Sequence, residues 1–307
     1  MQTTTAARPT IALDPATPEA IAALRAQPGF PQAMRASARG LVAMYQGSRL
    51  LNLLMDDRAR LLFGCFALHL HFSRDPADPA SGLTPGRMKA YCAELDICSA
   101  GRAVTMLALM RFAGYLAPDP NVSDRRQRRL VATDKLATLL AERWRLHFAA
   151  MAPLFPDGAA LRDAMDNPAF LPPLMRAMHH RFVAGFRFLT HAPGLGLFGE
   201  RDAGMLILAS LIAAGEADDT VPPTRPVRVS ISALSRRFTV SRAHVLKLIR
   251  DAVRDGFIAR VGAEGEQIAF LPRLAEAAPN VLATMYLFFA ACAREAQETL
   301  AQERRVA

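Results

Sequence analysis

Apolar residues recur at helical spacing along most of the chain, and short polar segments separate the runs. Between 85 and 95 the pattern predicts a helix, with Thr84 as its N-cap and Pro85 at its first position. Ser99 can cap a second helix, which is expected to end at Gly114. Two apolar runs then flank a basic loop, which predicts a two-stranded hairpin. The apolar face of the first of these helices holds Met88, Tyr91, Cys92 and Leu95.

The same order of signals returns in the second half of the chain. A strand is expected at 227–230, Ser241 can cap a helix that ends at Gly256, and a hairpin should turn at 262–265. Cap and terminal glycine are 15 residues apart in both segments. Both segments, about 83–133 and 225–272, therefore have the outline of a winged helix-turn-helix, in which the second helix enters the major groove of DNA.

The flanking helices also suggest a repeat. Helices are expected at about 17–28, 31–46, 57–73, 134–151 and 279–303, after a loose N-terminal tail. Landmarks recur in order at an offset that drifts only from 137 to 143 residues. We read this series as an internal duplication, with halves 1–153 and 154–307. The matching pairs are Leu24 with Leu161, Phe30 with Phe170, Met34 with Met175, 57–70 with 200–213, and 146–152 with 287–293.

The first hairpin resembles the wing of the MarR family of bacterial regulators. That family has Asp-x-Arg in the wing, then a strand, then a Thr that caps a long helix; the matching residues are Asp124, Arg126, Leu130 and Thr133. The family's glycine after the Thr is replaced by Leu136. The resemblance implies a mainly α fold with small β-wings, and MarR-like proteins are homodimers. Two winged units in tandem would sit on a helical, dimer-like body with pseudo-twofold symmetry.

The two winged units differ in where their cations lie. The second helix of the second unit carries Arg242, His244 and Lys247, which we expect to read base edges. The first unit should rely on its wing arginines, although Arg126 could instead brace the wing through Asp124. The target is therefore expected to have two unequal half-sites. The full set expected to contact double-stranded DNA is Ser99, Arg102, Thr105, Arg125, Arg126, Arg128, Arg129, Arg236, Arg237, Ser241, Arg242, His244, Lys247, Arg250 and Arg260.

Composition narrows the class of protein. A net charge of +9 favours a polyanionic partner, and 51% apolar residues argue against a disordered chain. The four cysteines lack metal-ligand spacing, and the N-terminus lacks the layout of a signal peptide. The apolar runs at 203–215 and 281–293 are shorter than the roughly 20 residues of a membrane span. We expect a cytoplasmic protein with no membrane partner.

No catalytic or metal-binding constellation is expected. The sequence lacks a P-loop, a GxSxG and an HExxH motif, so neither an enzyme, a cofactor nor a metal is predicted. His179 and His180 point to different faces of one helix, and Cys92 and Cys98 suit packing better than redox sensing. The Phe- and Met-rich segments 170–190 and 285–289 are expected in the core. They could also line a pocket for a small apolar effector, as MarR-like proteins have.

Three functions fit these observations. The leading hypothesis is a sequence-specific, DNA-binding transcriptional regulator, as a monomeric pseudo-dimer or a homodimer. A plasmid-type replication initiator would also have two winged-helix domains in a basic chain of this size. A winged-helix protein-interaction module that has lost DNA binding is the third, and the acidic second wing and the apolar second helix of the first unit favour it.

Overall fold

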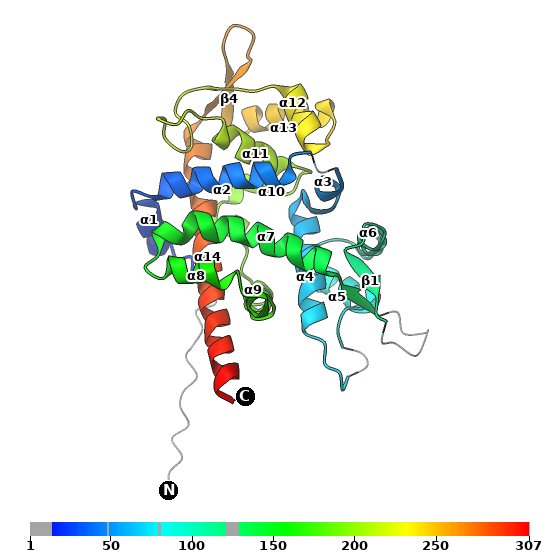
Figure 1. The fold of residues 1–307 in the computed structure, drawn as a ribbon. Helices are drawn as coiled ribbons and strands as arrows, with labels where there is room; N and C mark the ends of the chain where they lie inside the picture. The colour runs from blue at the N-terminus through cyan, green and yellow to red at the C-terminus, as the bar shows by residue number, and fades with distance from the viewer. Residues whose placement is uncertain (1–13, 48, 79–80, 121–128, 307) are drawn as a thin grey trace.

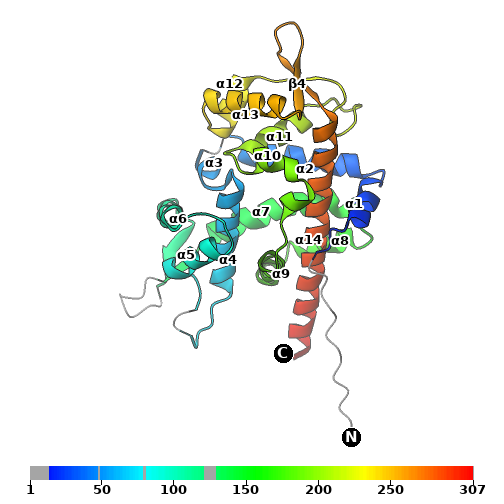
Figure 2. The same cartoon turned by 180° about the vertical axis from the view of Figure 1, so that it is seen from behind.

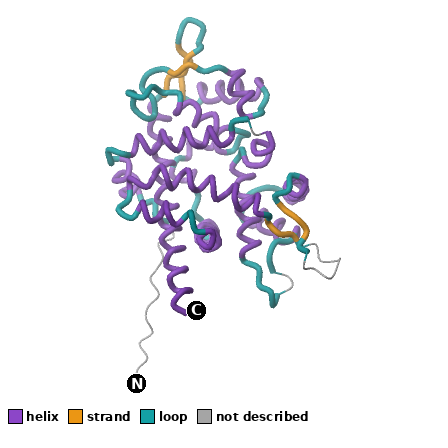
Figure 3. Tube along the Cα trace, viewed as in Figure 1, coloured by secondary structure: helices purple, strands orange, loops and turns teal. Residues whose placement is uncertain are grey.

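The structure is a computed structural model that describes residues 14–47, 49–78, 81–120 and 129–306. It is mainly helical with two small antiparallel sheets, so the expected fold class is confirmed at this level (Figure 3). Two groups of short helices with a hairpin lie at separate corners of a larger helical body (Figure 1). Seen from behind, the long C-terminal helix crosses that body (Figure 2).

In the first part of the chain, polar caps fix several helix starts. The side chains of Thr17, Asp57, Thr84 and Ser99 each accept a backbone N–H of the helix that follows. The element α3 was not expected from the sequence. The elements are α1 (Pro18–Arg25), α2 (Phe30–Tyr45), α3 (Arg49–Met55), α4 (Arg58–Phe72), α5 (Pro85–Glu94), α6 (Ala100–Phe112), β1 (Leu116–Pro118), β2 (Leu130–Ala132) and α7 (Asp134–Met151).

The second part of the chain has a similar order of helices and strands. It includes a helix pair and a hairpin, with β3 added to the hairpin in the sheet order β3-β5-β4. The corresponding strand in the first part is reduced to a single bridge between Leu83 and Leu130. The elements are α8 (Gly158–Ala164), α9 (Leu171–Val183), α10 (Gly196–Gly199), α11 (Gly204–Ala213), β3 (Val227–Arg228), α12 (Ile231–Phe238), α13 (Arg242–Arg254), β4 (Ile258–Val261), β5 (Gln267–Phe270) and α14 (Pro272–Val306), with short 3-10 turns between α7 and α10.

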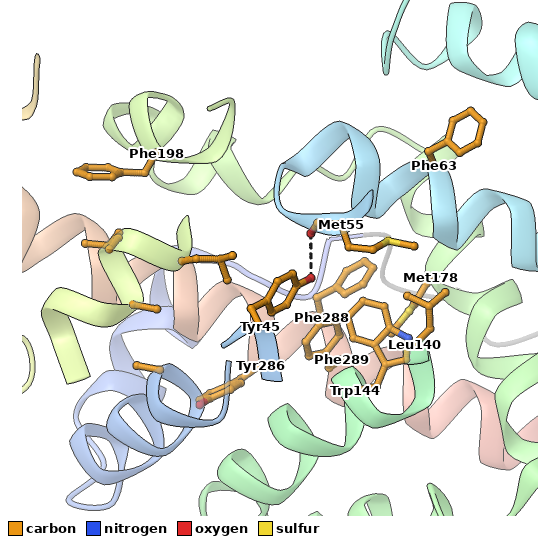
Figure 4. Close-up of a cluster of buried hydrophobic side chains, with 14 of the residues drawn as sticks. Tyr45, Met55, Phe63, Leu140, Trp144, Met178, Phe198, Tyr286, Phe288 and Phe289 are labelled. Carbon is orange, nitrogen blue, oxygen red and sulfur yellow. Dashed lines mark hydrogen bonds between the residues drawn. The ribbon is translucent and has the colours of Figure 1, made fainter. Parts of the chain in front are cut away.

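In the helical body, helices from each part of the chain pack against helices from the other part. Helix α2 packs on α11, and its counterpart α9 packs on α4; α1 packs on α14, and its counterpart α8 packs on α7. Buried polar contacts cross the same interface: Tyr286 of α14 donates to the Ala33 carbonyl at 2.9 Å, and its hydroxyl lies 2.6 Å from the Ser37 hydroxyl. The two parts therefore share one hydrophobic core, which includes Trp144, Phe288 and Phe289 (Figure 4).

Helix α14 begins earlier than expected. It starts at Pro272, not near 279, and Pro279 lies inside it. An interior proline removes one backbone hydrogen bond, which packing of α14 against α1 and α9 can offset. By length and composition the segment Pro272–Arg305 is apolar enough to cross a membrane, yet half of its most apolar window is buried inside the protein. This burial fits a core helix. The length and composition of the segment are only weak evidence for a membrane span.

Candidate nucleic-acid interface

The two helix pairs are built on the same backbone pattern. Ser99 Oγ accepts the Arg102 N–H at 3.3 Å, and Ser241 Oγ accepts the His244 N–H at 3.0 Å. Both second helices end on a left-handed glycine, Gly114 at φ 75° and Gly256 at φ 71°. The residue after each glycine then donates back to the last turn at 2.9 Å, to Met110 and Ala252 respectively. Each helix is thus fixed at both ends before its hairpin begins.

Helix α13 presents a row of cations to solvent. Arg242 and Arg250 are exposed, and so is Arg236 at the end of α12, whereas Arg237 is half-buried. In the described part of the chain, the guanidinium groups of Arg236, Arg242 and Arg250 have no hydrogen-bond or ion-pair partner. Lys247 is 63% exposed and only loosely paired, with its Nζ 3.5 Å from Asp251 Oδ2. These groups are free to meet an anionic surface.

Two of the residues assigned to this surface are engaged elsewhere. His244 is half-buried, and its Nε2 donates to the Asp202 carbonyl at 2.9 Å, which fixes the ring against the start of α11. Arg260 is exposed, but its Nε donates to the Gly265 carbonyl at 2.8 Å and so closes the turn of the β4-β5 hairpin. The sequence did not reveal these two contacts, and the expected contacts of His244 and Arg260 with DNA stay predictions.

Helix α6 offers little polar surface. Arg102 is bound to Asp57, with Nη2 2.8 Å from Oδ2, and Thr105 donates its hydroxyl to the Gly101 carbonyl of its own helix at 3.1 Å. Large apolar side chains are exposed instead: Val104 is 52% exposed and Phe112 is 89% exposed. Lys89 of α5 and Arg111 at the end of α6 are exposed, but the first two turns of α6 lack the cationic row of α13.

The first wing is described only at its base. Asp124, Arg125, Arg126 and Arg128 lie outside the described residues, so their assignments stay predictions. Arg129 lies inside them and is buried, with its Nη1 3.9 Å from the buried carboxylate of Asp119. Its expected contact with DNA is therefore not supported by its position, because the guanidinium is turned into the protein.

Thr133 also differs from what the resemblance implied. Its side chain does not cap α7. The hydroxyl instead donates to the carbonyl of Gly114 at 2.8 Å and lies 3.1 Å from that of Tyr115. Thr133 thus fastens the base of the first hairpin to the end of α6.

A cluster of charged side chains joins the N-terminal ends of α6 and α13. We call it the Asp–Arg cluster; its members are Asp56, Asp57, Arg60, Arg102 and Asp202. Arg60 is central: it pairs with Asp56, its Nε lies 3.3 Å from Asp57 Oδ2, and its Nη2 lies 3.3 Å from Asp202 Oδ1. Arg102 reaches the cluster from α6, and His244 reaches the Asp202 carbonyl from α13.

Burial makes the Asp–Arg cluster sensitive to pH. The side chains of Asp56 and Asp57 are each 4% exposed. Desolvation raises the pKa of Asp56 to about 6, against the lowering effect of Arg60. The three carboxylates lie within 4.8 Å of one another, a spacing that could suit a metal ion, but Arg60 contacts all three. No cation site is assigned there. The cluster was invisible in the sequence because its members lie up to 146 residues apart.

The other reactive side chains are arranged for packing. His179 stacks on His69 with ring centroids 3.7 Å apart, and burial lowers the pKa values to about 4 and about 3, so both rings are neutral at pH 7. Burial and the neighbouring Cys98 raise the pKa of Cys92 to about 12, which disfavours a reactive thiolate.

Comparison with known proteins adds no relative. No protein-family model, no curated protein and no solved structure matches the chain.

Proposed function

We propose that this protein is a sequence-specific, DNA-binding regulator whose single chain takes the place of a dimer. Its two helix pairs, α5-α6 and α12-α13, with their hairpins, would be tandem winged helix-turn-helix units. The reciprocal packing of α2 on α11 and of α9 on α4 supports an internal duplication assembled as a pseudo-twofold body. A cytoplasmic location is part of the same proposal.

The observation that carries this proposal is the cationic row on α13. Arg242 and Arg250 are exposed and have no protein partner in the described ranges, and Lys247 is mostly exposed beside them. The helix in this position of a helix-turn-helix inserts its N-terminal residues into the major groove. Arginine and lysine there can bind guanine edges or phosphates.

We call each winged unit a lobe: the first lobe is α5, α6, β1 and β2, and the second is α12, α13 and β3 to β5. The two lobes are expected to contribute unequally to DNA binding. With Arg102 engaged and apolar side chains exposed, α6 has few groups for base edges. The first lobe would then add phosphate contacts through wing arginines 125, 126 and 128. Successive major grooves on one face lie about 34 Å apart. In the described arrangement one Asp–Arg cluster holds the starts of both α6 and α13, so we expect the lobes to separate when both bind DNA.

Anisotropy titrations on a DNA fragment selected by the protein would test the proposal. The double variant Arg242→Ala/Arg250→Ala should bind at least tenfold more weakly. Its log–log salt slope should fall by about 2, because each lost phosphate contact removes about 0.9. The matched control is Arg304→Ala/Arg305→Ala, which removes two exposed cations at the end of α14. Equal losses in the two double variants would refute a specific role for α13.

A second function is favoured by one observation. Phe112, 89% exposed at the end of α6, and Val104 on the same helix are unusual surface residues for a DNA-reading helix. They suit a lobe that binds protein instead. If Phe112→Ser leaves DNA binding of the whole chain intact, Phe112 takes no part in DNA binding, and its exposure favours a protein partner for that lobe.

A further inference from the structure

The outer face of α6 is apolar and open to solvent. It carries Val104, which is 52% exposed, and Phe112, which is 89% exposed, together with the small exposed residues Gly101 and Ala108. At 3.6 residues per turn these four positions fall within about 80° of the helix circumference, so they form one stripe along the helix. We call this set the α6 stripe. Figures 1 and 2 both show α6 at the outer edge of the molecule, away from α14.

The matching face of α13 is cationic instead. The caps Ser99 and Ser241 are 142 residues apart, and this offset relates the two helices position by position. With that offset, the α6 residues Thr105, Ala108 and Phe112 stand where α13 has Lys247, Arg250 and Arg254. Between the repeats, groups that suit an anion are therefore exchanged for groups that suit an apolar surface. Contiguous exposed apolar residues of this kind mark a site of interaction with another protein surface.

The α6 stripe is complementary in shape to itself. Phe112 supplies a large side chain at one end, and Gly101 leaves a gap at the other end, where an added Cβ would meet no atom within 4 Å. The two positions are about 16 Å apart along the helix axis. In an antiparallel pair with a twofold axis through the middle of the stripe, each Phe112 lies over Gly101 of the partner subunit. The small Ala108 near the middle lets the two helices approach closely.

The charges of α6 favour an antiparallel pair over a parallel one. Arg111 is exposed at the edge of the stripe and has no ion pair among the described residues. A parallel pair would bring two Arg111 side chains together, whereas the antiparallel pair separates them by about 13 Å along the axis, more than the Debye length of about 8 Å. The antiparallel arrangement also sets the N-terminal end of each helix beside the C-terminal end of the other, so the helix dipoles attract.

We propose that the α6 stripe binds the α6 stripe of a second copy of this chain, with the two helices antiparallel. The pair of stripes would bury roughly 900 Å² in total, less than the about 1,200 Å² at which stable interfaces begin. A weak dimer is therefore expected, with a dissociation constant on the order of 10 μM. This contact is separate from the helical body, in which the two parts of one chain already pack together.

The dimer would regulate the first lobe. A paired α6 is covered by its partner, so it cannot approach a DNA groove, and DNA and the second copy compete for the same face. The DNA-bound form is then a single chain, and the free protein is paired at high concentration. This competition rests on the proposed function, whereas the dimer itself does not.

Sedimentation equilibrium of the whole protein without DNA tests the contact, between about 1 and 200 μM, where a contact of this area populates both states. The wild type should show a reversible monomer–dimer equilibrium, and Phe112→Ser or Val104→Ser should weaken it at least tenfold. Val183→Ser is the matched control, since Val183 is 51% exposed on α9, and it should change nothing. A monomer at every concentration would overturn the proposal, and so would a dimer that Phe112→Ser and Val104→Ser leave unchanged.

A second pair of variants tests the antiparallel fit. Gly101→Gln fills the gap without strain in the single chain, because that position is open, so it should weaken the dimer at least tenfold and preserve the unfolding midpoint. Adding Gly101→Leu to Phe112→Ala moves the large side chain to the other end and should restore part of the association that Phe112→Ala loses. No recovery would refute the packing of Phe112 on Gly101. Selected DNA should convert the dimer to single-chain complexes, and a dimer that persists on DNA would refute the competition. A dimer without any DNA binding would reject the regulator and leave the contact standing.

Discussion

Replacing Asp56 by asparagine tests the electrostatics of the Asp–Arg cluster. With Arg60 and Arg102 as its cations and three carboxylates, the cluster has a net charge of about −1 when every carboxylate is ionised. Burial raises the pKa of Asp56 from 3.8 to about 6, so folding opposes its ionisation. Asparagine keeps the shape and cannot ionise. We therefore expect Asp56→Asn to stabilise the protein at neutral pH.

The direction and size of the expected change in stability follow from the linkage between protonation and folding. A group whose pKa is higher in the folded state binds more protons there, so its contribution to stability is fully present below pH 3.8 and is lost as pH rises through about 6. A rise of about two pKa units corresponds to about 3 kcal/mol over the full range, at 1.36 kcal/mol per unit. Between pH 4.5 and pH 8 the advantage of Asp56→Asn over the wild type should grow by about 2 kcal/mol.

Urea unfolding of both proteins at several pH values measures that difference directly. Comparing the two proteins cancels the titration of other groups, including the buried histidines. Glu303→Gln, at an exposed position of α14, is the control and should give a difference that stays flat with pH. A flat difference for Asp56→Asn as well, or one that shrinks as pH rises, would refute the electrostatic reasoning.

Three further changes probe the lobes and the body. Asp57→Asn retains a capping side chain for α4 but weakens the pair with Arg102, so DNA affinity should rise about two- to fivefold in anisotropy titrations if the cluster restrains the lobes. Tyr286→Phe removes the buried hydroxyl bonds to α2 and should cost about 1–2 kcal/mol in urea unfolding. Glu295→Gln leaves the buried charge of Arg181 without its carboxylate and should cost about 2–4 kcal/mol.

Three results would contradict these expectations. Weaker DNA binding by Asp57→Asn would mean that the cluster supports the binding form. Unchanged stability of Tyr286→Phe would mean that its hydroxyl adds nothing to the interface between α2 and α14. For Glu295→Gln the comparison is Glu298→Gln, an exposed position of the same helix, and equal effects would show that burial of Arg181 is not the cause.

Local signals predicted much of the fold. The caps Thr84, Ser99 and Ser241 and the terminal glycines 114 and 256 act within one helical turn, so their sequence marks were sufficient. The hairpins and α7 were found for the same reason. Helix α3 and the early start of α14 were missed because α3 is short and packed on α4, and because Pro279 suggested a start where the helix in fact continues.

The sequence could not predict which charged side chains are exposed and which are paired. Arg129 looked like a free wing cation, but Asp119, ten residues before it, draws it into the protein. Arg102 and His244 looked like exposed readers, yet each meets a partner at least 42 residues away. Whether a cation is exposed or paired depends on tertiary contacts between distant segments, which periodicity and spacing do not encode.

We would first select genomic DNA fragments with the purified protein and then measure the stoichiometry of binding to the best site. We predict one chain per short site, with two unequal half-sites about one helical turn apart. A palindrome bound by two chains would contradict the single-chain pseudo-dimer. Absence of any enriched fragment would contradict DNA recognition itself and leave a protein-interaction module as the better account.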